Sequence, residues 1–170
     1  MTTRALEDSE IKATFGHIDG IHAKRNETLL IVGIGMALRA SELVSLQISD
    51  VYDRDKPKTY VTIRAETAKF NKERTIRIGF GMQETIADFV VWKVSNDESV
   101  EPNAPLFLSQ KGGCLTRQAL FELVKRIFNE ASINQSPHCL RKTGATIYYI
   151  ESDFDLIATQ YFLGHADPST

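Results

Sequence analysis

The sequence predicts an α+β protein that is mostly α-helical and has one small antiparallel β-hairpin. Apolar residues recur at helical spacing in several separate segments of the chain. A strict alternation of apolar and polar residues is confined to the region between residues 60 and 78, and no long linker interrupts the sequence. With 170 residues, the chain has the length of a single domain.

The first elements are predicted to be helices. Residues 7–17 have helical spacing, and residues 26–38 form an apolar stretch that is too long for an ordinary strand. Asn26 is expected to cap the second helix, and Ser41 to open a third, short one.

A β-hairpin and four further helices are predicted in the rest of the chain. The strands are residues 60–64 and 75–78, which alternate between polar and apolar side chains, and residues 69–73 are their polar turn. Helical spacing then returns in four segments: residues 82–94, 116–131, 137–151 and 154–162. Ser136 and Pro137 are typical of a helix start, so the third of these helices is expected to begin there.

Composition excludes several classes of protein. The first ten residues are polar and acidic and do not form a signal peptide, and no apolar run approaches the roughly 20 residues of a membrane span. Cys114 and Cys139 lack the spacing of metal ligands and fit a reducing compartment better than a disulfide framework. We therefore expect a cytoplasmic protein without a membrane partner.

The charges are unevenly distributed along the chain. A formal net charge of −2 gives no general case for nucleic-acid binding. Residues 54–77, however, hold eight Lys and Arg against three acidic residues, whereas residues 151–170 hold four acidic residues and no Lys or Arg. One face can therefore be basic although the whole protein is not, and composition alone leaves this open.

Residues 136–146 contain a possible phosphate site. His138 and Arg141 are three residues apart and share one face of the first helical turn. A helix N-terminus has free N–H groups and a partial positive charge, and both favour a bound anion. The alternative interpretation is an ordinary histidine and arginine at the surface of a helix start.

Arg39 stands among aliphatic residues, where a guanidinium is seldom found without a partner. A structural ion pair with Glu42 or with Asp50 is the simpler explanation of this position. From these residues alone, a functional role for Arg39 stays open.

The hairpin turn and the last residues give two further ambiguous signals. Lys69, Lys72 and Arg74 lie in or beside the turn, where such side chains are usually only solvated, although a lysine there can also donate a proton to a reacting group. His165 follows a glycine at a helix end, and most such histidines are caps or packing residues.

The order of these signals resembles a known family. The motifs are "LRASEL" with Arg39, "AKFNKER" with Lys69, "HCLRKTGAT" with His138 and Arg141, and "LGHADPST" with His165. They follow one another as the motifs of the catalytic domain of the tyrosine recombinases, the phage integrase family, do. We therefore expect the catalytic fold of that family, and a recombinase that breaks and rejoins DNA.

The resemblance implies a role for each matching residue. Arg39 and Arg141 would clamp the non-bridging oxygens of the scissile phosphate. Lys69 would protonate the leaving 5′-oxygen, His138 would transfer protons near the nucleophile, and His165 would hydrogen-bond the phosphate.

Other residues are expected to support this site or to contact DNA. Glu42 and Asp50 match acidic positions that support the fold around the first arginine. Lys72, Arg74 and Lys142 are expected to bind DNA. One departure from the family pattern is Met36-Ala37, which stands where Thr-Gly often precedes the first arginine.

The family's nucleophile is a tyrosine about nine positions after the histidine of "LGH", which forms a 3′-phosphotyrosyl ester. Here that position is near residue 174, and all five tyrosines of the chain precede His165. Tyr161 is expected to pack against the domain. We thus expect residues 1–170 to be a catalytic domain truncated before its nucleophile, without the amino-terminal core-binding domain and inactive in covalent cleavage.

No cofactor or metal is expected. Arg, Lys and His supply the positive charge that metal ions supply in many nucleases. A zinc site made of Cys114, Cys139, His138 and His165 has no closely spaced ligand pair. Two other functions stay open: a non-catalytic DNA-binding relative, and a phosphodiesterase that uses His, Lys and Arg without a covalent step.

The expected partners are double-stranded DNA and, in a synaptic assembly, other recombinase protomers. The chain by itself is expected to be a monomer that binds DNA weakly and in a strongly salt-dependent way. The family further implies a bacterial or phage-encoded protein that acts at the nucleoid.

Overall fold

The computed structural model describes residues 3–64 and 73–164. The elements in chain order are α1 (Asp8–Gly16), α2 (Ala23–Gly35), α3 (Ala40–Val44), α4 (Ile48–Val51), β1 (Tyr52–Asp53), β2 (Lys56–Pro57), β3 (Tyr60–Ile63), β4 (Arg74–Arg77), α5 (Phe80–Ser95), α6 (Arg117–Glu130), α7 (Cys139–Glu151) and α8 (Leu156–Leu163). Most elements are helices, and the sheets are small and antiparallel, so the predicted fold class is confirmed. Within the described ranges, none of the helices has the length and apolar character that crossing a membrane would require.

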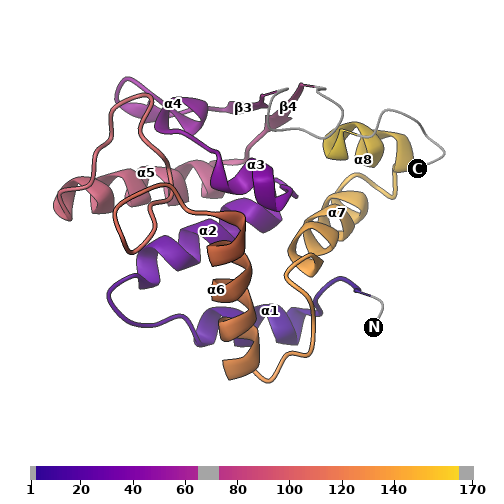
Figure 1. The fold of residues 1–170 in the computed structure, drawn as a ribbon. Coiled ribbons are helices and arrows are strands. Elements are labelled where there is room, and N and C mark those ends of the chain that lie inside the picture. Colours follow the sequence, from indigo (N-terminus) through magenta and orange to yellow (C-terminus); the bar gives the residue numbers. More distant parts are fainter. Residues whose placement is uncertain (1–2, 65–72, 165–170) are drawn as a thin grey trace.

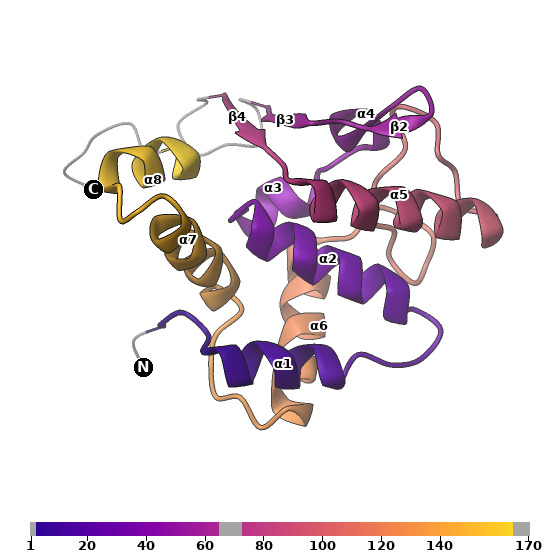
Figure 2. The same ribbon diagram turned by 180° about the vertical axis from the view of Figure 1, so that it is seen from behind.

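Helix α2 lies in the middle of the molecule. It packs against α3, α5 and α7, while α1 and α6 lie at the end away from the sheets (Figures 1 and 2). Leu29, Leu30 and Val32 of α2 are completely buried. Contacts on several sides explain why this helix carries a continuous apolar stretch instead of one apolar stripe.

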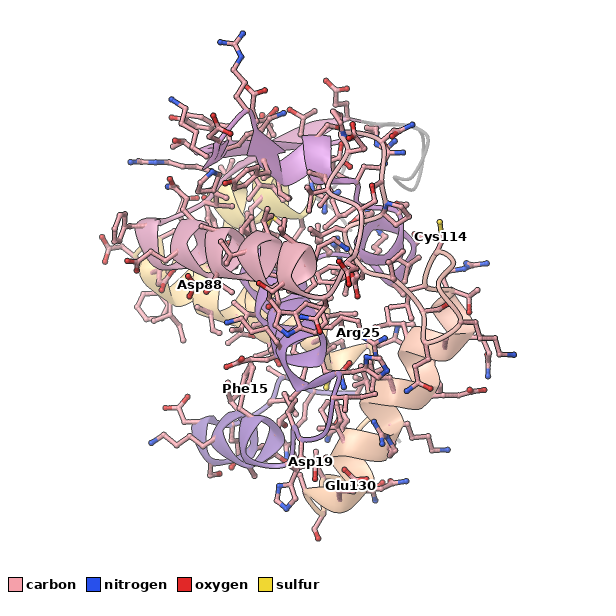
Figure 3. All side chains as sticks on the ribbon, turned by 90° about the vertical axis from the view of Figure 1, so that its left-hand side faces the viewer. Phe15, Asp19, Arg25, Asp88, Cys114 and Glu130 are labelled. Atoms are coloured by element: carbon pink, nitrogen blue, oxygen red, sulfur yellow. The ribbon has the colours of Figure 1, made fainter. Side chains whose placement is uncertain are left out.

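Helix α2 begins earlier than the sequence predicts. Its first residue, Ala23, donates its amide N–H to the carbonyl of Gly20, 3.0 Å away, in a turn where Gly20 has a φ of 78°. Asn26 therefore lies inside the helix, and the prediction that it caps the helix is wrong. Its Oδ1 accepts hydrogen bonds from the buried Arg25, which also donates to the carbonyl of Leu108 and so ties α2 to a distant loop (Arg25 is labelled in Figure 3).

The predicted hairpin is formed by β3 and β4. Val61 lies opposite Ile76, and Ile63 lies opposite Arg74. All four side chains are buried, which places this face of the hairpin against the core. Residues 65–72, which include most of the predicted turn, lie outside the described part of the chain.

Two small features were not predicted. Helix α4 has four residues, and the sheet of β1 and β2 has two residues in each strand. Elements this short have little periodicity and depend on their tertiary neighbours for stability.

The second half of the chain follows the prediction closely. The helix α6 is capped by Thr116, whose hydroxyl accepts a hydrogen bond from the amide of Ala119 at 3.1 Å. Helix α7 begins two residues later than expected, after a turn in which the carbonyl of Ser136 accepts from the amide of Cys139. Both cysteines are free: Cys139 is buried, and Cys114 is exposed and points outward in Figure 3.

Helices α2 and α7 approach each other very closely at Gly144. A Cβ added at this position would collide with the carbonyl of Ile34 and touch the side chain of Ala37. The absence of a side chain at Gly144 thus lets the first turns of α7 lie directly against the end of α2.

Candidate active site

Glu42 is the centre of a cluster of arginines. Its side chain is completely buried on the short helix α3. Its carboxylate accepts the backbone N–H of Arg39 at 2.8 Å and the Nη1 of the same residue at 2.9 Å. Of the two structural partners considered for Arg39, Glu42 is therefore the one found.

Arg74 is the second partner of Glu42. Its Nη1 and Nη2 lie 2.7 and 2.9 Å from the two carboxylate oxygens, which is a bidentate pair. Only 6% of the Arg74 side chain is exposed. In β4, Arg74 and Ile76 face inward whereas Thr75 and Arg77 face outward, so the alternation of the strand buries this arginine.

The burial of Arg74 corrects one of the predictions. A residue paired with Glu42 inside the protein does not offer its guanidinium to DNA, so the exposed position assumed for Arg74 is wrong.

Arg141 approaches the cluster from α7. It donates one hydrogen bond to the carbonyl of Ala37 and another, 2.9 Å long, to the carbonyl of Leu163 at the end of α8. Its Nη1 lies 3.9 Å from Glu42. Burial and, to a lesser degree, the charge of Arg39 lower the pKa of Arg141 to about 10, which leaves it charged at neutral pH.

The turn before Arg39 has a special backbone conformation. Ala37 has a φ of 45°, in the left-handed region that favours glycine. This conformation accompanies the hydrogen bond from Arg141 to the carbonyl of Ala37.

The cluster carries an excess of positive charge. Three guanidinium groups surround one carboxylate. Burial alone would raise the pKa of Glu42, but the hydrogen bonds from Arg74 and Arg39 outweigh it and hold that pKa below its ordinary value. The carboxylate is thus ionised at neutral pH, and two positive charges are left for an anion.

A cavity of about 1010 Å³ opens beside the cluster. Arg39, His138, Arg141 and Lys142 line it, together with mostly apolar residues of α3, α6 and α7. About a fifth of each side chain of Arg39 and Arg141 is exposed, 22% and 19%, whereas Arg74 stays behind them. The cavity can therefore present the guanidinium groups of Arg39 and Arg141 and an imidazole to a bound phosphate, and Arg117 of α6 also lines it.

Lys142 lies at the edge of this cavity and is exposed, as a DNA-binding residue would be. Its Nζ donates to the carbonyl of Thr3. The predicted residues Lys69, Lys72 and His165 lie outside the described part of the chain.

Asp50 supports a different part of the fold from the one predicted. Its carboxylate accepts the backbone N–H of Gln47 at 2.8 Å and pairs with Arg64 at 3.2 Å. Arg64 also donates to the carbonyl of Ser45 at 2.6 Å. Asp50 therefore holds the end of β3 against the segment between α3 and α4, and Arg39 pairs with Glu42 instead.

No tyrosine in the described part of the chain lines the cavity. Tyr161 on α8 is 76% exposed, so the expectation that it packs against the domain is wrong. Its neighbour Phe162 has that function instead and stacks on Tyr148 of α7 with ring centroids 4.0 Å apart.

In the described ranges, no group of three or more His, Cys, Asp or Glu side chains is placed to hold a metal ion.

Sequence reasoning missed Arg74 as a partner of Glu42, and it missed the carbonyls of Ala37 and Leu163. The apolar Ile76 indicates which face of β4 is buried. Because side chains alternate along a strand, Arg74 lies on the same buried face, and this was a signal for its pairing inside the protein. No sequence signal indicates which backbone carbonyls an arginine will reach.

The sequence profile of the phage integrase family matches residues 4–170. Tyrosine recombinase XerC of Caldanaerobacter subterraneus subsp. tengcongensis is 32% identical over 168 residues, covering 97% of this chain and 44% of that protein. Transposase A from transposon Tn554 of Staphylococcus aureus is 31% identical over 176 residues, covering 98% of this chain and 46% of that protein. The chain spans about half the length of these relatives.

Solved structures show the same architecture. XerH in a post-cleavage complex with palindromic difH substrate matches with a TM-score of 0.74 and 26% identity, over 99% of this chain and 48% of that one. XerA recombinase matches with a TM-score of 0.79 and 21% identity, over 99% of this chain and 59% of that one. The predicted catalytic fold is thereby confirmed.

Proposed function

Because this chain belongs to the phage integrase family, we propose that it is the catalytic part of a site-specific DNA recombinase. Such an enzyme cuts and rejoins DNA strands through a 3′-phosphotyrosyl intermediate. One observation carries the proposal: Arg39 and Arg141 reach a single cavity from a cluster whose charge Glu42 does not balance. Two guanidinium forks suit the non-bridging oxygens of a phosphodiester, and their charge favours a pentacoordinate transition state.

The proposed reaction consists of two transesterifications. A tyrosine hydroxyl, predicted near position 174, attacks the phosphorus, and the bond to the 5′-oxygen breaks. His138 takes the proton that the tyrosine loses, and Lys69 gives a proton to the 5′-oxygen. Arg39 and Arg141 hold the phosphate, with a hydrogen bond from His165. A 5′-hydroxyl of a second strand then reverses the steps and releases the tyrosine, so that no external energy or cofactor is needed.

The proposed partners are double-stranded DNA and further protomers of the same enzyme. XerH was solved with its difH substrate, and a lambda integrase dimer was solved bound to a COC′ core site. We place the activity in the cytoplasm of a bacterium, at the nucleoid, with Lys142 and Lys72 as contacts to the DNA backbone. The 170-residue chain alone is proposed to be a monomer.

A covalent trapping experiment tests the function. The chain is extended through the predicted tyrosine and incubated with a nicked suicide duplex, whose cleaved end diffuses away. We expect a protein–DNA adduct on a denaturing gel, and we expect Arg141→Ala to reduce its rate of formation by about 100-fold or more, because a transition-state contact is lost.

Arg126→Ala is the matched control, since Arg126 is an exposed arginine on α6. Its adduct should form at the rate of the unaltered protein. An extended chain that forms no adduct, or one whose adduct survives Arg141→Ala undiminished, would contradict the proposed function.

A further inference from the structure

Arg74 makes the most complete contact with Glu42. Both of its terminal nitrogens bind, one to each carboxylate oxygen. Arg39 makes one side-chain hydrogen bond to the same carboxylate, and Arg141 lies 3.9 Å away. The arginine that neutralises Glu42 most directly is therefore the one that does not line the cavity.

Because Arg74 makes most of the contacts with Glu42, Arg39 and Arg141 are available to bind an anion. If Arg74 were absent, the buried carboxylate would attract Arg39 and Arg141 more strongly and would compete with a bound anion for their N–H groups. With Arg74 present, the carboxylate is already paired, and most of the donors on Arg39 and Arg141 can serve an anion or the backbone.

Structural stability alone does not account for an arginine at this position. Among the described residues, the buried Nε of Arg74 has no hydrogen-bond partner, and a buried donor without a partner is unfavourable. Replacing a buried ion pair by apolar residues of similar size is often neutral or stabilising. A role in the site explains why the charge is present.

Arg74 also connects three segments of the chain. It opens β4, directly beyond residues 65–72, and it binds Glu42 of α3. It further packs against the end of α8, where a Cβ added at Gly164 would lie 2.8 Å from its Cδ.

We propose that Arg74 is a positioning residue. By pairing with Glu42 it keeps Arg39 and Arg141 free to bind the phosphate of the substrate. This inference rests on the proposed function, because it assumes that an anion binds between these two arginines.

The test uses the 170-residue chain and sulfate, which keeps the same charge from pH 6 to 8. The side-chain Nε–H signals of Arg39 and Arg141 are followed by NMR as sulfate is added. In Arg74→Met, we expect the dissociation constant for sulfate to rise by about tenfold, the loss typical of a charge-assisted contact. Arg77→Met removes the same charge from the exposed face of β4 and should stay within about twofold of the unaltered chain.

A second variant separates positioning from a merely structural role. Arg74→Met combined with Glu42→Gln removes both partners and restores the original excess of two positive charges. We expect it to regain most of the lost sulfate affinity. If Arg74 acted only by holding its neighbouring segments together, the double variant would lack that contact as well and would bind sulfate as weakly as Arg74→Met. Because the double variant leaves no unpaired charge at this pair, it also decides the question if Arg74→Met alone fails to fold.

The outcomes are distinct. If sulfate moves neither arginine signal in the unaltered chain, the anion site of the proposed function fails. If sulfate binds there, the inference about Arg74 is overturned when Arg74→Met binds as well as the unaltered chain, or when the double variant binds sulfate about tenfold or more weakly than the unaltered chain.

Discussion

At the scale of single residues, Glu42 connects the stability of the protein to its site. It is buried with three arginines around it, and its negative charge offsets part of their positive charge. The same carboxylate caps its own helix by accepting the backbone N–H of Arg39. One ionised side chain therefore contributes both to the stability of the fold and to the position of Arg39.

We predict that Glu42→Gln lowers the free energy of unfolding at pH 7 by about 3–5 kcal/mol, because it leaves Arg74 buried without a counter-charge. The lowered pKa of Glu42 determines how this loss of stability depends on pH. A depressed folded-state pKa gives stability that is complete above the ordinary value of 4.5 and is lost as pH falls through the folded pKa. The difference between the two proteins should thus be largest near neutral pH and shrink below pH 4.5, as measured by urea unfolding at several pH values.

Asp50→Asn is the control for that measurement. Asp50 pairs with Arg64, whose side chain is about one-third exposed at 34%, so we expect a loss of about 1 kcal/mol or less. A Glu42→Gln effect that stayed constant down to pH 3.5 would show that the carboxylate's charge is not the cause.

Sequence motifs identified some residues of the site and missed another. Arg39, His138 and Arg141 were identified from their motifs, and the structure brings all three to one cavity. The burial of Arg74 was missed because Arg74 was grouped with Lys69 and Lys72 as part of a solvated turn. The alternation of side chains in β4 turns Arg74 toward the core instead.

At the scale of elements, the contact between α2 and α7 determines where the second arginine lies. Gly144 lets the two helices approach until the backbone of α2 fills the place of a side chain. Three residues earlier on α7, Arg141 reaches the carbonyl of Ala37 just beyond the end of α2.

Gly144→Ala should therefore destabilise the protein, although alanine is the better helix former. We expect a loss of about 1–3 kcal/mol from overpacking, measured by chemical unfolding. Gly81→Ala, in α5 with open space around it, should be neutral or stabilising by up to about 1 kcal/mol. Equal effects of the two substitutions would argue against the close helix contact.

Long elements were predictable and short ones were not. The helices α2, α5 and α6 have enough residues for their periodicity to stand out. Helix α4 and the β1–β2 sheet have too few residues for a pattern, and their position depends on the segments that they touch. The starts of α2 and α7 were misplaced because local turns, not the preferred cap residues, begin these helices.

At the scale of the whole molecule, the chain brings together residues that are far apart in sequence. Arg141 and Ala37 are separated by 104 positions, and Arg74 and Glu42 by 32. Motif order indicated a shared site, but the partners of each side chain depend on packing that no local pattern contains.

The overall charge predicts how the chain binds DNA. The net charge is −2, so attraction must come from local cations and not from the protein as a whole. We expect Lys142→Ala to weaken binding to duplex DNA and to reduce the slope of log K against log salt by about 1, the change for one lost phosphate contact. Fluorescence anisotropy across a salt series measures this slope, with Lys125→Ala on the exposed face of α6 as the control. An unchanged slope would exclude Lys142 as a phosphate contact.

The anchoring of Arg141 has a consequence for how the sequence can diverge. Both of its hydrogen-bond acceptors are main-chain carbonyls, at Ala37 and Leu163. A carbonyl is present whichever amino acid occupies the position, so substitutions at either residue keep the acceptor as long as the backbone path is kept. The orientation of Arg141 is thus inherited through the path of the backbone, and the side chains at positions 37 and 163 can change as long as they fit that path, as Ala37 does at its positive φ.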